Sequence, residues 1–284
     1  MDLEKLPANF NWKHYATLHP WFQLTTEEAS ARHYLVYGYQ GGYTYNYANL
    51  DVLVYSTGKT GSSTLMMSFK TIGKNATTMH EDSKLPSVDR IVDIINYPRV
   101  QKLLVVTSYR EPISQYLSLL FQNIPYHLSM PVAQILQHNI EWVNQQAVKF
   151  VAQSITSHYE CPFSVNQMKN YDGANIYKSE FNKDLGFVTL ETERLNILVL
   201  VFEKIQNWTS IIQNNTRYKN FEMKLSNITS GKDIGKLYKD VQSTIVIPKQ
   251  VLDTIYKREE LNMKYFYTPE EVVNIKKRWY DRLP

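Results

Sequence analysis

Apolar runs and longer helical segments alternate along most of the chain. Four short runs of apolar and β-branched residues predict strands at residues 51–56, 76–80, 102–109 and 196–202. The apolar runs are continuous rather than interrupted at every second position, which is typical of strands covered on both faces. The segments between and after them predict helices at residues 62–72, 87–97, 112–123 and 131–158. This order predicts a three-layer α/β/α fold with a parallel sheet in the middle layer.

Both ends of the chain have helical patterns. In the aromatic-rich first 48 residues, Thr25 or Thr26 can cap a helix, and the sequence Gln-Gly-Gly ends it. The carboxy-terminal third predicts helices joined by polar loops, with Thr268 as the cap of a closing helix. The chain has no internal repeat and no Pro- or Gly-rich linker. We therefore divide it into a small helical N-terminal module, residues 1–48, and one α/β domain, residues 49–284.

Composition narrows the classes of protein that fit this fold. The net charge of +4 is enough to favour an anionic ligand but too small for a nucleic-acid-binding profile, so no nucleic-acid partner is expected. The one cysteine, Cys161, excludes an internal disulfide framework and a Cys-based zinc site. No segment has the apolar length of a signal peptide or a membrane span, so we expect a cytoplasmic protein without a membrane span.

A turn rich in Gly, Lys, Ser and Thr follows the first predicted strand. The strand end, the turn and the start of a helix together place several backbone N–H groups at one point, which predicts an anion site. A Walker-type loop has its lysine after the last glycine, whereas Lys59 precedes Gly61 here. In this order Ser62 and Ser63 can hold a phosphate while Lys59 reaches toward the atom that leaves it. A plain strand-to-helix turn is the alternative.

The end of the third predicted strand offers a second anion site. Arg110 follows the strand directly, and Ser114 and Ser118 lie one turn apart on the next helix. An arginine can grip a phosphate through two N–H groups, and a helical hydroxyl can close the site from the side. Parallel sheets bind ligands at the carboxyl ends of their strands, so both sites are expected to share one nucleotide. A surface ion pair is the alternative for Arg110.

Two neighbouring residues are candidates for a catalytic base. His80 ends the second predicted strand, at the same sheet edge as Lys59 and Arg110, and Glu81 follows it. A hydrogen-bonded structural role is the alternative for His80. His158 and Cys161 could suggest a metal pair, but no further ligand of matching spacing accompanies them, so no metal is expected.

These motifs resemble those of sulfotransferases. The order Lys-Thr-Gly-Ser-Ser-Thr at residues 59–64 is similar to their 5′-phosphosulfate loop, and Arg110 with Ser118 has the spacing of their 3′-phosphate motif. Residues 51–284 also resemble the capsular polysaccharide synthesis family, through "YSTGKTGSST", "MHED", "SYREPISQYLS" and "GFVTLETERLNILVLVFE". The sequence "GKLYK" at residues 235–239 is similar to that family's Asn-Lys-Trp-Tyr-Lys box and departs from it at two positions.

The resemblance implies a P-loop, sulfotransferase-like fold and an enzyme. Its donor would be 3′-phosphoadenosine 5′-phosphosulfate, its product 3′,5′-diphosphoadenosine, and its acceptor a carbohydrate hydroxyl of a capsule, glycan or glycolipid, with no metal required. The implied donor-binding residues are Lys59, Thr60, Gly61, Ser62, Ser63, Thr64, Arg110 and Ser118. The implied catalytic residues are Lys59 and either His80 or Glu81. The alternatives are a non-catalytic polysaccharide-assembly protein with the same pocket and a divergent nucleotide kinase.

Overall fold

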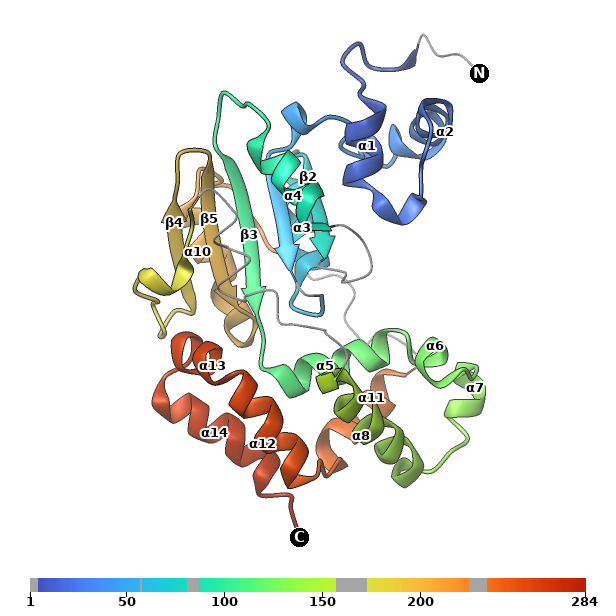
Figure 1. The fold of residues 1–284 in the computed structure, drawn as a ribbon, viewed down its shortest axis with the longest axis vertical. Coiled ribbons are helices and arrows are strands. Elements are labelled where there is room, and N and C mark those ends of the chain that lie inside the picture. Colours follow the sequence, from blue (N-terminus) through green and yellow to red (C-terminus); the bar gives the residue numbers. More distant parts are fainter. Residues whose placement is uncertain (1–4, 57, 81–86, 157–172, 225–233) are drawn as a thin grey trace.

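The computed structural model describes residues 5–56, 58–80, 87–156, 173–224 and 234–284 (Figure 1). These residues form a five-stranded sheet in the order β2-β1-β3-β5-β4. The strands are β1 (Val52–Ser56), β2 (Ala76–His80), β3 (Leu103–Tyr109), β4 (Phe187–Glu191) and β5 (Leu195–Val201). The four predicted strands are parallel to one another and begin and end within one residue of the predicted positions.

The fifth strand, β4, was not among the predicted strands. It pairs with β5 in the antiparallel sense and forms one edge of the sheet. Only Val188 of its five residues is fully buried, so the strand lacks the continuous apolar run that marked the others. An edge strand with one exposed face has no need of such a run. The sheet is therefore mostly, but not entirely, parallel.

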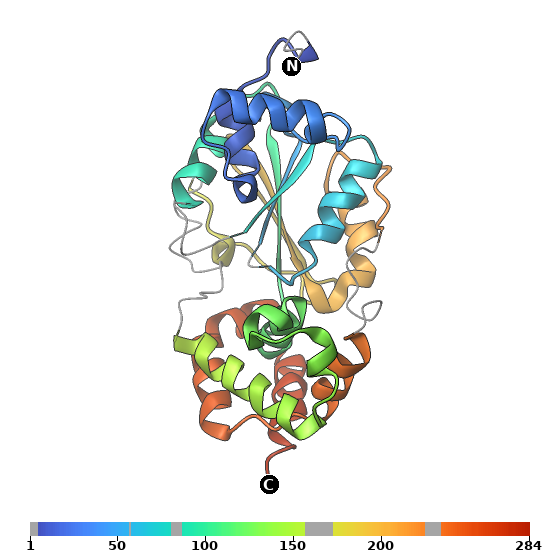
Figure 2. The ribbon, with the colours of Figure 1, turned by 90° about the vertical axis from the view of Figure 1, so that its right-hand side faces the viewer.

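Helices cover both faces of the sheet (Figure 2). Side chains alternate along β1, so that Val52 and Val54 join one apolar cluster while Leu53 and Tyr55 join another. The first cluster includes residues of α3 (Ser62–Thr71) and α10 (Trp208–Asn215). The second includes residues of α4 (Ser87–Asn96). The structure is thus an α/β fold in which the sheet has helices on either side.

One predicted helix is divided in two. The pattern predicted a single helix over residues 131–158, whereas the structure has α7 (Val132–Ile135) and α8 (Ile140–Thr156). The side chain of Asn139 accepts a hydrogen bond from the backbone N–H of Trp142 at 2.9 Å, which starts a new helix there. The prediction of one continuous helix was therefore wrong. The predicted helices at 62–72, 87–97 and 112–123 end within one residue of α3, α4 and α5.

A layer of helices lies below the carboxyl ends of the parallel strands (Figures 1 and 2). Its members are α5 (Pro112–Gln122), α6 (Ile124–Leu128), α7, α8, α11 (Gly235–Thr244), α12 (Lys249–Arg258), α13 (Glu260–Phe266) and α14 (Pro269–Tyr280). Apolar side chains of this layer, such as Leu117 and Trp279, continue the cluster on the α4 face of the sheet. Thr268 caps α14 in a capping box with Glu271, as its sequence predicted.

The N-terminal module packs at the opposite end of the sheet (Figure 1). It contains α1 (Trp12–Leu18) and α2 (Glu27–His33), with short helical turns at Pro20–Phe22, Tyr34–Gly38 and Tyr47–Asn49. Of the two candidate caps, Thr26 is the one that accepts a hydrogen bond, from the backbone N–H of Ala29 at 3.2 Å. Leu18 is fully buried in the cluster on the α4 face of the sheet. The module is therefore an integral part of the hydrophobic core.

Within the described ranges, no helix is both long enough and apolar enough to cross a bilayer.

His19 is a buried ionisable group of this module. It is 4% exposed, and its Nε2 lies 2.8 Å from the carbonyl oxygen of Thr44. Burial lowers the pKa of His19 to about 4, although the hydrogen bond to Thr44 opposes that shift and Lys70 adds to it. The folded protein therefore holds this imidazole in its neutral form, donating to the carbonyl.

The buried imidazole predicts that the protein loses stability in weak acid. Between about pH 6.5 and about pH 4 the unfolded chain binds a proton at His19 that the folded chain does not, which lowers the free energy of unfolding by up to about 3 kcal/mol. His19→Gln keeps a donor for Thr44 and should flatten this part of a urea-unfolding pH series. The variant at exposed His138, His138→Gln, should keep the wild-type slope. An unchanged slope in His19→Gln would contradict the assignment.

Candidate functional site

The loop between β1 and α3 has an unusual backbone. Gly58, Lys59 and Gly61 all have positive φ angles, of 81°, 59° and 89°. At Gly61 only glycine fits, because a Cβ atom would lie 2.8 Å from Cη2 of Trp208. The indole of Trp208 cannot move aside easily, since it is fully buried and its N–H donates to the carbonyl of Val201 at 3.0 Å.

The helix that follows the loop begins without a side-chain cap. Gly61 is the cap residue of α3 and has no side chain with which to cap this ten-residue helix. Ser62, Ser63 and Thr64 form the first turn, with Ser62 and Thr64 buried and Ser63 half-buried. The N–H groups of this first turn and the positive end of the helix dipole favour an anion at this point.

Three hydrogen bonds attach this loop to the segment that contains Arg110. The Arg110 guanidinium donates through Nη1 to the carbonyl of Lys59 at 2.9 Å. Gln115 donates to the carbonyl of Gly58 at 2.9 Å, and the Ser108 hydroxyl donates to the carbonyl of Thr60 at 2.7 Å. The structure therefore brings together the two anion motifs that the sequence predicted at one edge of the sheet.

Two polar atoms in this region are buried without a hydrogen-bond partner among the described residues. They are Nε of Arg110 and Oγ1 of Thr60. The Arg110 guanidinium also lies over the ring of Phe202, with Cζ 4.3 Å from the ring centroid. Leaving a buried polar atom unpaired costs about 1–3 kcal/mol, so such atoms are usually satisfied by a ligand or water. The residues present thus fit a phosphorylated ligand.

The start of α5 differs from the start of α3. The side chain of Glu111 accepts hydrogen bonds from the N–H groups of Ile113 at 3.0 Å and Ser114 at 2.7 Å, so a carboxylate already caps this helix. Ser114 and Ser118 are both buried on α5. No hydrogen bond joins Ser118 to Arg110 or to the described part of the loop. The proposed contact of Ser118 with a phosphate held by Arg110 stays a prediction.

The sequence reasoning gave no role to Glu203, which lies two residues after the end of β5 at the same edge. Its carboxylate accepts one hydrogen bond from the N–H of Glu111 at 3.0 Å and another from the hydroxyl of Tyr267 at 2.6 Å. The side chain reaches solvent, yet the dense protein around it raises the pKa of Glu203 by desolvation, while these two hydrogen bonds and Arg110 oppose the shift. A glutamate directly after a continuous apolar run was the signal that could have identified it.

The candidate bases are only partly described. His80 ends β2 and pairs in register with Ser56, the last residue of β1, so its backbone lies at the predicted edge. The side chain of His80 and all of Glu81 lie outside the described part of the chain, as do His158 and Cys161. Among the described residues, no group of three or more His, Cys, Asp and Glu side chains is placed to hold a metal ion.

The "GKLYK" segment forms the start of α11. Tyr238 is buried there, whereas Lys236 and Lys239 are exposed, and Lys236 pairs with Asp240 at 3.1 Å. The two lysines therefore lie on the solvent-facing side of an amphipathic helix, and Tyr238 lies on its buried side.

Comparisons of the chain with protein-family models, with curated proteins and with solved structures find no match. The functional argument therefore depends on the motifs and on the geometry of this edge of the sheet.

The contact between Gly61 and Trp208 predicts that one methyl group added at Gly61 lowers the stability of the protein strongly. Gly61→Ala should destabilise the protein by about 3 kcal/mol, because backbone strain adds to the clash with a fixed indole ring. Gly73→Ala is the matched control, since Gly73 also has a positive φ of 73° but a Cβ there meets no atom within 4 Å. It should cost only about 1–2 kcal/mol. Equal losses of stability in the two variants, measured by denaturant unfolding, would contradict the role of Trp208.

Proposed function

We propose that the protein is a sulfotransferase that uses 3′-phosphoadenosine 5′-phosphosulfate to modify a carbohydrate hydroxyl. The observation that carries this proposal is the hydrogen bond from Arg110 to the carbonyl of Lys59. This bond joins the loop in which Lys59 precedes the last glycine to the arginine that follows β3. The start of α3, whose cap residue is glycine, lies at this loop, as do two buried polar atoms without a partner among the described residues. A donor with two separate phosphates needs such a pair of neighbouring anion sites.

Each element of the site has a proposed part in holding the donor. The N–H groups at the start of α3, with Ser62 and Ser63, would hold the 5′-phosphate, and Arg110 would hold the 3′-phosphate. Thr60, Gly61 and Thr64 would shape the loop. The donor, when bound, supplies a sulfuryl group activated by its bond to phosphate. Ser118 on α5 is the proposed hydroxyl partner of the 3′-phosphate.

The catalytic parts are proposed for Lys59 and a base. The Lys59 ammonium would stabilise the negative charge that grows on the leaving phosphate oxygen, which is an interaction made only in the transition state. The acceptor hydroxyl must lose its proton, and His80 or Glu81, at the end of the strand beside β1, is the proposed acceptor of that proton. A nucleotide kinase fits less well for two reasons. The lysine of the loop precedes the last glycine, and β3 ends at Tyr109 and is followed by Arg110 rather than by a magnesium-binding aspartate.

Calorimetric titration with 3′,5′-diphosphoadenosine tests the donor site. We expect binding without metal, and a loss of about 10- to 100-fold in affinity for Arg110→Ala, because charge-assisted hydrogen bonds to the phosphate are removed. Arg194→Ala, at an exposed arginine near the opposite ends of the strands, should bind as the wild type does. Absence of diphosphate binding would overturn the proposal, and magnesium-dependent binding of ATP in its place would favour the kinase alternative.

Removal of the Lys59 ammonium tests the proposed chemistry. Lys59→Ala should lower kcat by about 100- to 1000-fold while changing the affinity for the diphosphate far less, since the lysine acts in the transition state. The rate is measured as release of 3′,5′-diphosphoadenosine in the presence of a glycan acceptor. Lys249→Ala, at an exposed lysine on α12, is the control. A wild-type protein that binds the diphosphate but transfers nothing to any glycan would favour the non-catalytic alternative.

A further inference from the structure

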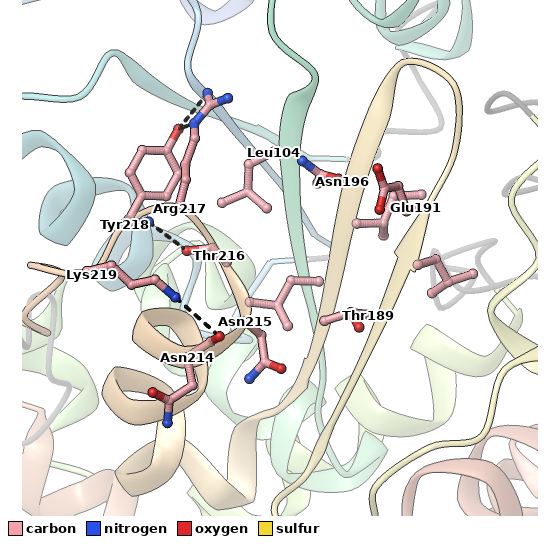
Figure 3. A pocket seen from close by; sticks show the side chains of 13 residues that line it. Leu104, Thr189, Glu191, Asn196, Asn214, Asn215, Thr216, Arg217, Tyr218 and Lys219 are labelled. Atoms are coloured by element: carbon pink, nitrogen blue, oxygen red, sulfur yellow. Dashed lines mark hydrogen bonds between the residues drawn. The ribbon is translucent and has the colours of Figure 1, made fainter.

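A pocket lies at the amino-terminal ends of the parallel strands (Figure 3). The Lys59 loop is at the opposite ends of these strands. Its volume is about 480 Å³. Its floor is the start of β5, where Asn196 pairs in register with Leu104 of β3, together with the end of β4. Its wall is the carboxyl end of α10 and the segment 216–219 that follows.

The two cations that line this pocket are engaged by the protein itself. The Arg217 guanidinium donates to the hydroxyl of Tyr218 at 2.9 and 3.1 Å, and to the carbonyl of Lys102 at 3.2 Å. The Lys219 ammonium donates to carbonyl oxygens at the end of α10, including that of Gln213 at 2.9 Å. These bonds satisfy the last carbonyl groups of the helix and a strand-end carbonyl. Neither cation is therefore directed at a ligand.

The acidic group of the lining is engaged as well. The carboxylate of Glu191 forms an ion pair with the ammonium of Lys102 at 2.6 Å. The Arg217 guanidinium also lies 3.9 Å from a carboxylate oxygen of Asp51. Of the charged residues that line the pocket, only Lys219 lacks a carboxylate partner among the described residues, and its ammonium is directed to main-chain carbonyl oxygens. The groups left to recognise a ligand are uncharged.

The uncharged polar side chains lie on the floor and on the wall of the pocket. Asn196 is half-buried on β5, Thr189 is exposed on β4, and Asn214 is exposed at the end of α10. In the described part of the chain, none of these three side chains makes a hydrogen bond. An amide offers both donors and acceptors, and a hydroxyl offers one donor and two acceptor positions. A half-buried amide without a partner favours a ligand that supplies one.

We propose that this pocket binds a neutral, polyhydroxylated ligand, a sugar unit of a carbohydrate. The amides of Asn196 and Asn214 and the hydroxyl of Thr189 would pair with sugar hydroxyl groups. Leu104 and Leu198 lie beneath the floor of the pocket and are themselves buried, so the polar groups carry the recognition. The volume lies in the range of small-molecule sites, roughly 300–1000 Å³. This assignment does not depend on the chemistry of the Lys59 loop.

Saturation-transfer NMR titrations with maltose, lactose and N,N′-diacetylchitobiose test this site. At least one of these disaccharides should bind the wild-type protein. Asn196→Leu keeps the shape of the side chain without its hydrogen bonds and should weaken binding by about 10-fold. Thr189→Val, on the edge strand, should weaken it by about 3- to 10-fold. Asn220→Leu, which places the same substitution at an exposed asparagine outside the pocket lining, should leave binding unchanged.

Three results would overturn the assignment. They are the absence of binding by all three disaccharides, undiminished affinity in both Asn196→Leu and Thr189→Val, and displacement of the bound sugar by inorganic sulfate. Arg110→Ala should bind the disaccharide as the wild type does, because Arg110 lies at the other ends of the strands. Loss of nucleotide binding and loss of sugar binding would thus be seen in different variants.

Discussion

The hydrogen bond from Arg110 to the carbonyl of Lys59 is the contact on which the candidate site depends. Lys59 has a left-handed backbone that costs a residue with a side chain about 1–2 kcal/mol. The loop is held in this form from two sides, by the donors of the β3–α5 segment and by the indole of Trp208 against Gly61. The strain is therefore supported by the neighbouring strand, which is typical of binding sites.

Two carboxylates extend this arrangement into the helical layer below the sheet. Glu203 accepts hydrogen bonds from the backbone of Glu111 and from Tyr267, and the side chain of Glu111 accepts another from Tyr256 at 3.1 Å. The residue that follows Arg110 is thereby held by helices that come much later in the chain. The backbone beside Arg110 is thus held in place by α12 and by the residue that directly follows α13.

The sequence predicted the central strands well and the edges of the fold poorly. Buried parallel strands carry continuous apolar runs, so their limits could be located closely, whereas β4 is half-exposed and has no such run. The break before α8 depends on a single capping bond at Asn139 within an otherwise helical pattern. Order and spacing placed Lys59 and Arg110 at one edge of the sheet. The roles of Trp208 and Glu203 depend on contacts between distant segments, which no local pattern encodes.

The two proposed binding sites lie at opposite ends of the strands, and this separation constrains the acceptor. Strand β5 has seven residues, so the pocket at Asn196 and the edge that holds Arg110 are about 20 Å apart along the sheet. The sheet is covered by helices on both faces and is too rigid to bring the two ends together. A carbohydrate held at Asn196 could present a hydroxyl near Lys59 only if it were a chain of several sugar units. If both proposals hold, joint use of the two sites would select a polymeric acceptor over a single sugar.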